Sequence, residues 1–181
     1  VSTAPLGRYE IIDGLPSSDW VCTGSAYQDP ISWLNNGYND FIVPMMYYSQ
    51  HNYFPYLADW VDRVGNNGYM VAGLGAYRMD KREGNWSLDE LKEQITATRQ
   101  HGTAGQAYFR MQHLRQFPDL AHLLACNYYQ HPALIPPMRH CNTSTIPPTH
   151  SIEVSRCHTG DTIRWEAVED AIRYAVYASA T

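Results

Sequence analysis

The feature that most constrains the fold of this chain is a fourfold alternation between apolar, strand-like segments and segments with helical periodicity. The strand-like segments cover residues 1–4, 40–47, 69–77 and 103–109. Apolar residues at helical spacing predict helices over 27–36, 56–64, 88–101 and 118–128. Strands that are joined by single helices form right-handed crossovers and a parallel sheet. The pattern therefore predicts an α/β fold in which the four strands are parallel neighbours in chain order, with the helices on one side.

Two of these segments carry further local signals. The run Asp40–Tyr47 is almost continuously apolar, as in a strand buried on both faces, although Pro44 cannot donate a hydrogen bond to a sheet ladder. Ser87 and Glu90 predict a capping box, in which Ser87 Oγ accepts from the Glu90 N–H and the Glu90 carboxylate accepts from the Ser87 N–H. Trp86 precedes this cap, where a hydrophobic staple is a better interpretation than the wall of a sugar subsite.

The sequence changes character after residue 134. Two Ile-Pro-Pro motifs bracket a polar linker that cannot continue a helix. Residues 151–157, 161–168 and 172–178 then alternate apolar and polar side chains, which predicts three short antiparallel strands. We therefore expect a first domain over 1–134, a linker over 135–150 and a small β segment over 151–181.

Composition excludes some classes of function. The chain has 181 residues, a formal net charge of −5 and a pI near 5.9, so it lacks the basic surplus that binding of nucleic acid requires. No apolar run approaches the ~20 residues that span a membrane. Tyrosine is abundant, with 14 Tyr against 4 Phe. Such side chains either line a wet cleft, as in a sugar-binding site, or form a core whose hydroxyls reach its rim.

The four cysteines do not indicate a metal site. None lies in a CxxC pair, and no Cys/His spacing matches a zinc motif. Pairing of Cys141 with Cys157 in an oxidising compartment is one alternative, and free, mostly buried thiols are the alternative that we favour. We expect neither a metal nor a cofactor.

The order and spacing of several sequence blocks resemble a known protein family. The blocks are Val1–Gly7, Trp33–Tyr48, Tyr56–Trp60, Gly73–Arg78, Leu91–Ile95 and Gly105–Arg110. Together they resemble strands five to eight, with the intervening helices, of the glycosyl-hydrolase-like family 10, also called domain of unknown function 187. The resemblance covers roughly residues 1–115 and includes Pro44. The tail, with Trp165, Tyr174, Val176 and Tyr177, resembles the first three strands of a fibronectin type III domain.

This resemblance implies a fold, a substrate class and a location. The fold is the C-terminal half of a (β/α)8 TIM-type barrel, followed by a partial fibronectin type III-like segment. The implied partner is a carbohydrate substrate, hydrolysed by two carboxylates with retention or inversion. The implied location is outside the cytoplasm of a bacterium, in the periplasm, on a lipid anchor or secreted.

The resemblance also implies what this chain lacks. In the family, the acidic residues suited to catalysis lie on strand four, which is not in this sequence. We therefore expect a fragment of a glycoside hydrolase that is inactive by itself. A half barrel leaves apolar sheet edges open, and we expect these edges to pair with a second copy or with another chain.

The candidate site lies at the C-terminal ends of the strands, where the sites of such barrels form. The candidate substrate-binding residues are Tyr47, Tyr48, Tyr77, Arg78 and Arg110. Tyr47 and Tyr48 have two alternative roles. Either at least one of them stacks on a sugar, or one points into the barrel core and the other packs under a helix. Arg78 either binds a substrate oxygen or carboxylate, or pairs with Asp80 or Glu83. Arg110 either binds substrate or braces the barrel mouth.

No catalytic residue can be assigned with this pattern. Asp80 is a carboxylate at a strand end, but its charged neighbours predict a solvated loop. His51 and His113 are interpreted as loop histidines rather than general bases. Three classes of function stay open: a glycoside hydrolase, a non-catalytic glycan-binding or envelope scaffold protein on the same fold, and an unrelated α/β enzyme.

Overall fold

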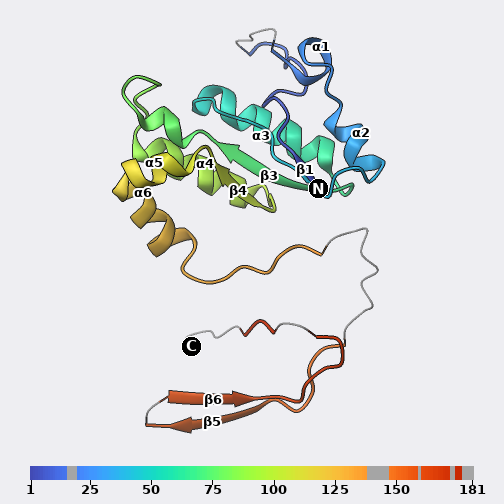
Figure 1. Ribbon diagram of the computed structural model, residues 1–181, viewed down its shortest axis with the longest axis vertical. Helices are drawn as coiled ribbons and strands as arrows, with labels where there is room; N and C mark the ends of the chain where they lie inside the picture. Colours follow the sequence, from blue (N-terminus) through green and yellow to red (C-terminus); the bar gives the residue numbers. More distant parts are fainter. Residues whose placement is uncertain (16–19, 138–146, 159, 172–173, 177–181) are drawn as a thin grey trace. The chain divides into compact units, whose positions relative to one another are not determined.

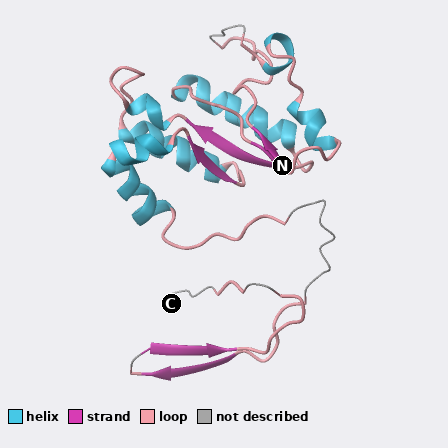
Figure 2. Ribbon diagram, in the orientation of Figure 1, coloured by secondary structure: helices cyan, strands magenta, loops and turns pink. Residues whose placement is uncertain are grey.

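A computed structural model describes residues 1–181 except 16–19, 138–146, 159, 172–173 and 177–181. The chain divides into two compact units, Val1–Ala133 and Leu134–Thr181 (Figure 1). The first unit combines strands and helices, and the second contains a β hairpin (Figure 2). Among the described residues, no helix is both long enough and apolar enough to span a membrane.

The first unit contains a four-stranded parallel sheet in the order β1-β2-β3-β4. The strands are β1 Ser2–Thr3, β2 Phe41–Ile42, β3 Tyr69–Leu74 and β4 Gly105–Tyr108. Parallel bridges from Leu6 to Met45 and from Met45 to Gly73 extend the ladder beyond β1 and β2. The predicted order and direction of the strands are confirmed, and the architecture is compatible with part of an α/β barrel.

Helices of different lengths connect and follow these strands. They are α1 Cys22–Ser25, α2 Pro30–Asn35, α3 Gln50–Val64, η1 Ala76–Met79, α4 Leu88–Gln100, α5 Met111–Gln116, α6 Pro118–Leu123 and η2 Leu124–Tyr128. The sequence interpretation started α3 at residue 56, but the helix starts at Gln50 and runs through Pro55. It also missed α5, and it extended the third strand over the short helix η1.

The helices α3 and α4 cover one face of the sheet. Ile42, Met70 and Ala72 are at most 4% exposed and share a core cluster with residues of both helices. Their helical partners in that cluster include Leu57, Trp60, Leu91 and Ile95. The residues between them in the strands, such as Val71, are only partly buried. Since successive side chains of a strand point to opposite faces, the second face is not covered by these helices.

Pro44 follows β2 and takes part in the sheet only as an acceptor. Its carbonyl oxygen accepts a hydrogen bond from Gly73 N at 3.1 Å. A Cβ at position 73 would lie 2.3 Å from this oxygen, so the approach requires glycine. The missing N–H of Pro44 is therefore compatible with its place beside β3.

The start of α4 shows half of the predicted capping box. Ser87 Oγ accepts from Glu90 N at 3.2 Å, as predicted. The Glu90 carboxylate instead accepts from Gln94 Nε2 at 2.7 Å, within the helix. Trp86 packs against the core cluster that contains Leu91, which fits the predicted staple.

The second unit contains an antiparallel hairpin of β5 Glu153–Cys157 and β6 Gly160–Arg164. β5 lies within the first predicted strand, and β6 overlaps the second but starts one residue earlier. Of the third predicted strand, residues 172–173 and 177–178 lie outside the described residues, and Tyr174–Val176 are not in a strand. The ring of Tyr174 lies 5.3 Å from that of Trp165. The relation to a fibronectin type III domain stays a prediction.

The cysteines differ from the prediction of mostly buried thiols. Cys22 is buried in the core, but Cys126 and Cys157 are exposed, so the prediction is wrong for these two. Cys126 lies on η2, and its Sγ is 3.6 Å from Nδ1 of His122 on the preceding helix α6. Cys141 lies outside the described residues, so its pairing with Cys157 stays open.

Candidate functional site

The carboxyl ends of β2, β3 and β4 bring three aromatic rings together. Ring centroids are 5.6 Å apart for Tyr47 and Tyr77, 5.6 Å for Tyr47 and Phe109, and 5.8 Å for Tyr77 and Phe109. Each residue follows its strand at the same edge, because the strands are parallel and in register. We call Tyr47, Tyr77 and Phe109 the strand-end cluster.

Backbone contacts hold the strand-end cluster in place. Tyr77 N donates to Phe109 O at 3.0 Å, and Phe109 N donates to Leu74 O at 2.9 Å. A Cβ at Gly75 would lie 3.2 Å from Tyr47 Cβ, so the glycine leaves room for the Tyr47 side chain. Phe109 is 47% exposed, so the cluster presents an aromatic face to solvent. The cluster is therefore a positioned apolar surface rather than part of the core.

Two arginines extend the strand-end cluster. The guanidinium of Arg78 lies 5.0 Å from the Tyr77 ring centroid, and that of Arg110 lies 5.9 Å from the Phe109 centroid. Arg78 Nη1 donates to the Glu83 carbonyl oxygen at 2.8 Å, while its enclosed Nε has no hydrogen-bond partner. The ion pair of Arg78 with Asp80 or Glu83 that the sequence suggested is replaced by this backbone contact.

Tyr48 does not join the strand-end cluster. Its ring lies 5.9 Å from that of Tyr56, a fully buried residue of α3. The Arg8 guanidinium stacks on both rings, 4.7 Å from the Tyr48 centroid and 5.2 Å from the Tyr56 centroid. Burial raises the pKa of Tyr48 to about 12. Of the five predicted binding residues, four gather at the β2–β4 exits, and Tyr48 packs under α3.

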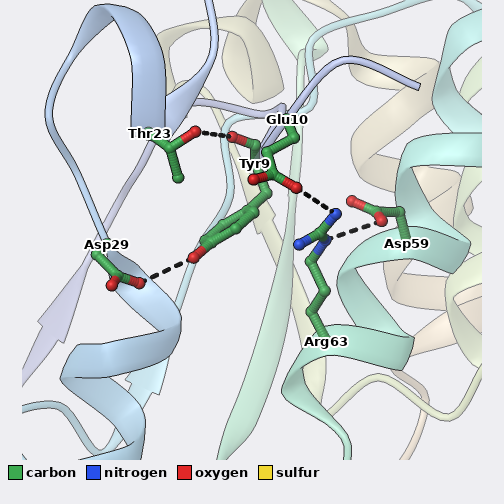
Figure 3. Close-up of polar contacts among 6 residues, drawn as sticks. All are labelled: Tyr9, Glu10, Thr23, Asp29, Asp59 and Arg63. Atoms are coloured by element: carbon green, nitrogen blue, oxygen red, sulfur yellow. Dashed lines mark hydrogen bonds and ion pairs between the residues drawn. The ribbon is translucent and has the colours of Figure 1, made fainter. Parts of the chain in front are cut away.

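The exit of β1 is occupied by a polar network that ties it to the helices (Figure 3). Tyr9 Oη donates to Asp29 Oδ1 at 3.0 Å, and the guanidinium of Arg63 lies 4.4 Å from the Tyr9 ring centroid. Arg63 also pairs with Glu10 at 3.0 Å and with Asp59 at 2.8 Å. Burial, together with the hydrogen bond to Asp29, raises the pKa of Tyr9 to about 12. Glu10 follows β1 and was not among the candidates predicted from the sequence. Its carboxylate is engaged by Arg63 in this network.

Asp80 belongs to an exposed loop after β3, as predicted. Its carboxylate accepts from Arg82 N at 2.9 Å and from Gln116 Nε2 at 2.8 Å. The Arg82 N–H, followed by Gln116, lowers the pKa of Asp80, so the group is ionised at neutral pH. A shallow pocket of about 450 Å³ opens beside it, lined in part by Met79, Asn85 and Phe117. Within the described part of the chain, no group of three His, Cys, Asp or Glu residues is placed to hold a metal ion.

His113 differs from its interpretation as a loop histidine. It is 7% exposed and lies in the first turn of α5. Its ring centroid lies 6.3 Å from those of Tyr77 and Phe117. His113 therefore packs against the strand-end cluster through Tyr77. The loop interpretation is also wrong for His51, which is an exposed residue in the first turn of α3. The signal that sequence reasoning missed was the helical spacing of His113, Leu114 and Phe117 after Arg110.

The comparisons with known proteins give a distant sequence relationship. The molecule is an α/β protein with a parallel sheet, and its sequence is related to a glycosyl hydrolase. No protein-family model matches the sequence. Glycosyl hydrolase YngK of Bacillus subtilis (strain 168) is 30% identical over 121 residues, which cover 62% of this chain and 24% of that protein. The chain thus spans about a quarter of the length of this relative.

Proposed function

We propose that this chain forms part of the carbohydrate site of a glycoside-hydrolase-like protein. The observation that carries the proposal is the strand-end cluster, a half-exposed aromatic face with two adjacent guanidinium groups at the carboxyl edge of a parallel sheet. In barrels built from such sheets, this edge holds the site. The distant relationship to a glycosyl hydrolase supports the same class of ligand.

The chemistry of the strand-end cluster suits a sugar ring. The apolar C–H face of a sugar packs on aromatic rings, while hydroxyls and guanidinium groups at the rim exchange hydrogen bonds with its polar edge. Burial and the neighbouring Tyr77 raise the pKa of Tyr47, so its hydroxyl stays protonated at neutral pH. Tyr47 can therefore donate a hydrogen bond to a sugar oxygen.

We further propose that this chain does not hydrolyse a glycosidic bond by itself. Hydrolysis by the common route needs two carboxyl groups that flank the scissile bond. The carboxylates near the strand exits have other partners: Glu10 pairs with Arg63, and Asp80 accepts from Gln116 and from the Arg82 backbone. In this proposal, the catalytic pair belongs to a part of the relative's fold that the alignment does not cover.

A non-catalytic glycan-binding or scaffold protein on the same fold is the second candidate. The engagement of Glu10 and Asp80 favours it, because a binding protein needs the aromatic face and no acid and base. Pairing of the open sheet edges with a second copy or another chain, and a location outside the cytoplasm, stay predictions under both candidates.

Isothermal titration of the chain with a panel of bacterial envelope and extracellular oligosaccharides tests the proposal. Phe109→Ala should weaken binding of the best ligand by roughly tenfold, since ~1.4 kcal/mol of lost stacking corresponds to that factor. Tyr38→Ala is the matched control, because Tyr38 is 69% exposed and lies outside the strand-end cluster. Binding that Phe109→Ala leaves unchanged, or no binding to any glycan, would refute the proposal.

A further inference from the structure

We propose that the glycan recognised at the strand-end cluster carries carboxylate groups, and that Arg78 and Arg110 bind one of them. This inference rests on the proposed function and adds the charge of the substrate. Arg78 follows β3 and Arg110 follows β4, so the two guanidinium groups lie at neighbouring positions of one edge. Each stacks on a ring of the same cluster.

The ion pairs among the described residues do not involve the β3 and β4 ends of this edge. They join Val1 to Asp40, Arg63 to Glu10 and Asp59, and Lys92 to Asp89. Arg63 alone takes two carboxylates, whereas no described residue gives Arg78 or Arg110 an acidic partner. The chain has a formal net charge of −5, so acidic side chains outnumber basic ones. Arg78 and Arg110 stack on two rings whose centroids lie 5.8 Å apart, and neither has a carboxylate partner among the described residues, so one anion from outside can serve both.

The hydrogen bonds of Arg78 leave capacity for such an anion. A guanidinium has five N–H donors in a planar fork that matches the two oxygens of a carboxylate. The Glu83 carbonyl oxygen takes one bond at Nη1, and the enclosed Nε has no partner. The enclosed Nε is out of reach of a ligand, but Nη2 is not enclosed and has no hydrogen-bond partner among the described residues. A carboxylate at the terminal nitrogens would stabilise Arg78 more than a sugar hydroxyl, because both groups are charged.

The acidic neighbours of Arg78 do not fill this role. Asp80 faces Gln116 and the Arg82 N–H, which lower its pKa and use its oxygens. Glu83 contacts Arg78 through its backbone oxygen, and the residue is exposed. Lys81 and Arg82, on the same loop, are exposed and add positive charge beside Asp80. The rim of the strand-end cluster therefore keeps a cationic side.

Matched pairs of acidic and neutral glycans test the inference. Oligosaccharides of polygalacturonate, alginate and hyaluronan are titrated into the chain beside the same oligosaccharides after chemical reduction of their carboxyl groups. We expect at least one acidic member to bind about tenfold tighter than its reduced partner, the factor typical of a hydrogen bond to a charged group. Its affinity should fall as salt rises from about 0.05 M to about 0.5 M.

Two variants assign the preference to the arginines. Arg110→Gln removes an exposed charge and should abolish most of the preference for the acidic glycan, with an unchanged circular dichroism spectrum. Arg78→Lys keeps the charge but loses the planar fork, and should reduce the preference as well. Lys92→Gln removes one positive charge from α4 and is the matched control, expected to keep it.

The outcomes separate this inference from the proposed function. Equal binding of an acidic glycan and its reduced partner, or a preference that survives in Arg110→Gln, would overturn the inference and leave the proposed function standing. Failure of both members of every pair to bind would overturn the inference and count against the proposed function as well.

Discussion

The two ends of the sheet edge use the same residue types for different purposes. At the β1–β2 end, Arg8 stacks on Tyr48 and Tyr56, and Arg63 stacks on Tyr9 and pairs with two carboxylates. At the β3–β4 end, Arg78 and Arg110 stack on the strand-end cluster without an acidic partner among the described residues. Tyrosine and arginine thus form a scaffold at one end and an accessible surface at the other.

The difference comes from the helix that follows each strand. The 15-residue helix α3 follows β2 and places Tyr56 and Trp60 over the β1–β2 end. The four-residue helix η1 comes directly after β3 and the six-residue helix α5 directly after β4, and Phe109 stays 47% exposed there. The longer helix α4 begins only at Leu88 and packs its Leu91 and Ile95 into the core cluster. A Tyr–Arg pair at a strand end is therefore a binding candidate only where the next helix leaves it uncovered.

The largest effect should come from the anchor of the β1–β2 end. Trp60 is fully buried, and its Nε1 donates to Gly7 O at 2.8 Å. Trp60→Ala should lower the free energy of unfolding by about 3–5 kcal/mol, because it opens a cavity and leaves the Gly7 carbonyl unpaired. Urea denaturation followed by circular dichroism measures the change. Trp20→Ala is the control, since Trp20 is 65% exposed; equal losses in both variants would contradict a scaffold role for this end.

Neighbouring tyrosines should show opposite phenotypes. Tyr48→Ala should lower the free energy of unfolding by about 2 kcal/mol, since its ring packs against Tyr56 and Arg8. Tyr47→Ala should cost less stability, about 1 kcal/mol for lost aromatic contacts, but more glycan affinity. Urea denaturation and isothermal titration of both variants give the comparison. If Tyr47→Ala and Tyr48→Ala lost stability and glycan affinity in the same proportion, the distinction between a structural end and a binding end of the sheet edge would be wrong.

The order and the parallel direction of the strands could be predicted from the sequence. Continuous apolar runs such as Asp40–Tyr47, separated by helical periods, determine parallel neighbours, and these signals depend on local patterns alone. The position of Ser87 before α4 was also readable, because capping uses residues within one turn. The start of α3 could not be predicted from the sequence. Proline is normally unfavourable inside a helix, but burial of Tyr53 and Tyr56 stabilises the helix on both sides of Pro55.

The site was only partly readable from the sequence. Strand ends mark candidate positions, and Tyr47, Tyr77, Arg78 and Arg110 do lie together. Adjacent positions such as Tyr47 and Tyr48 differ only in the side of the strand on which they emerge, and the irregular backbone after Pro44 determines this. Phe109 was predicted as the last residue of the fourth strand and not as part of the site, because its exposure depends on tertiary packing that a local pattern does not show.

Alkaline pH should lower the free energy of unfolding through the partly buried tyrosines at the β1–β2 end. The pKa of Tyr48 is about 12 in the folded chain and near 10 when unfolded, so the folded state holds the proton more tightly. The stability that this supplies is complete below pH ~10 and is lost as pH rises through ~12. Tyr48→Phe should therefore flatten the fall of unfolding free energy over this range. Tyr9→Phe is the matched comparison, since the pKa of Tyr9 is also raised to about 12. An unchanged slope in both variants would contradict the burial of these hydroxyls.

The smallest effect should come from Asp80, a carboxylate in the loop after β3. Its folded pKa is lowered by the Arg82 N–H and Gln116, so any stability that it adds is present above its unfolded pKa and is lost as pH falls through the folded value. Asp80 is only partly buried, and an asparagine keeps one side-chain oxygen, which can still accept from the Arg82 N–H but not also from Gln116. Asp80→Asn should therefore cost little stability at pH 7 and leave glycan affinity nearly unchanged. Reducing-sugar assays over a panel of polysaccharides should detect no turnover by the chain with either residue. Saturable hydrolysis that Asp80→Asn abolishes would place a catalytic carboxylate at the β3–β4 end, and that end would then be an active site rather than a binding surface.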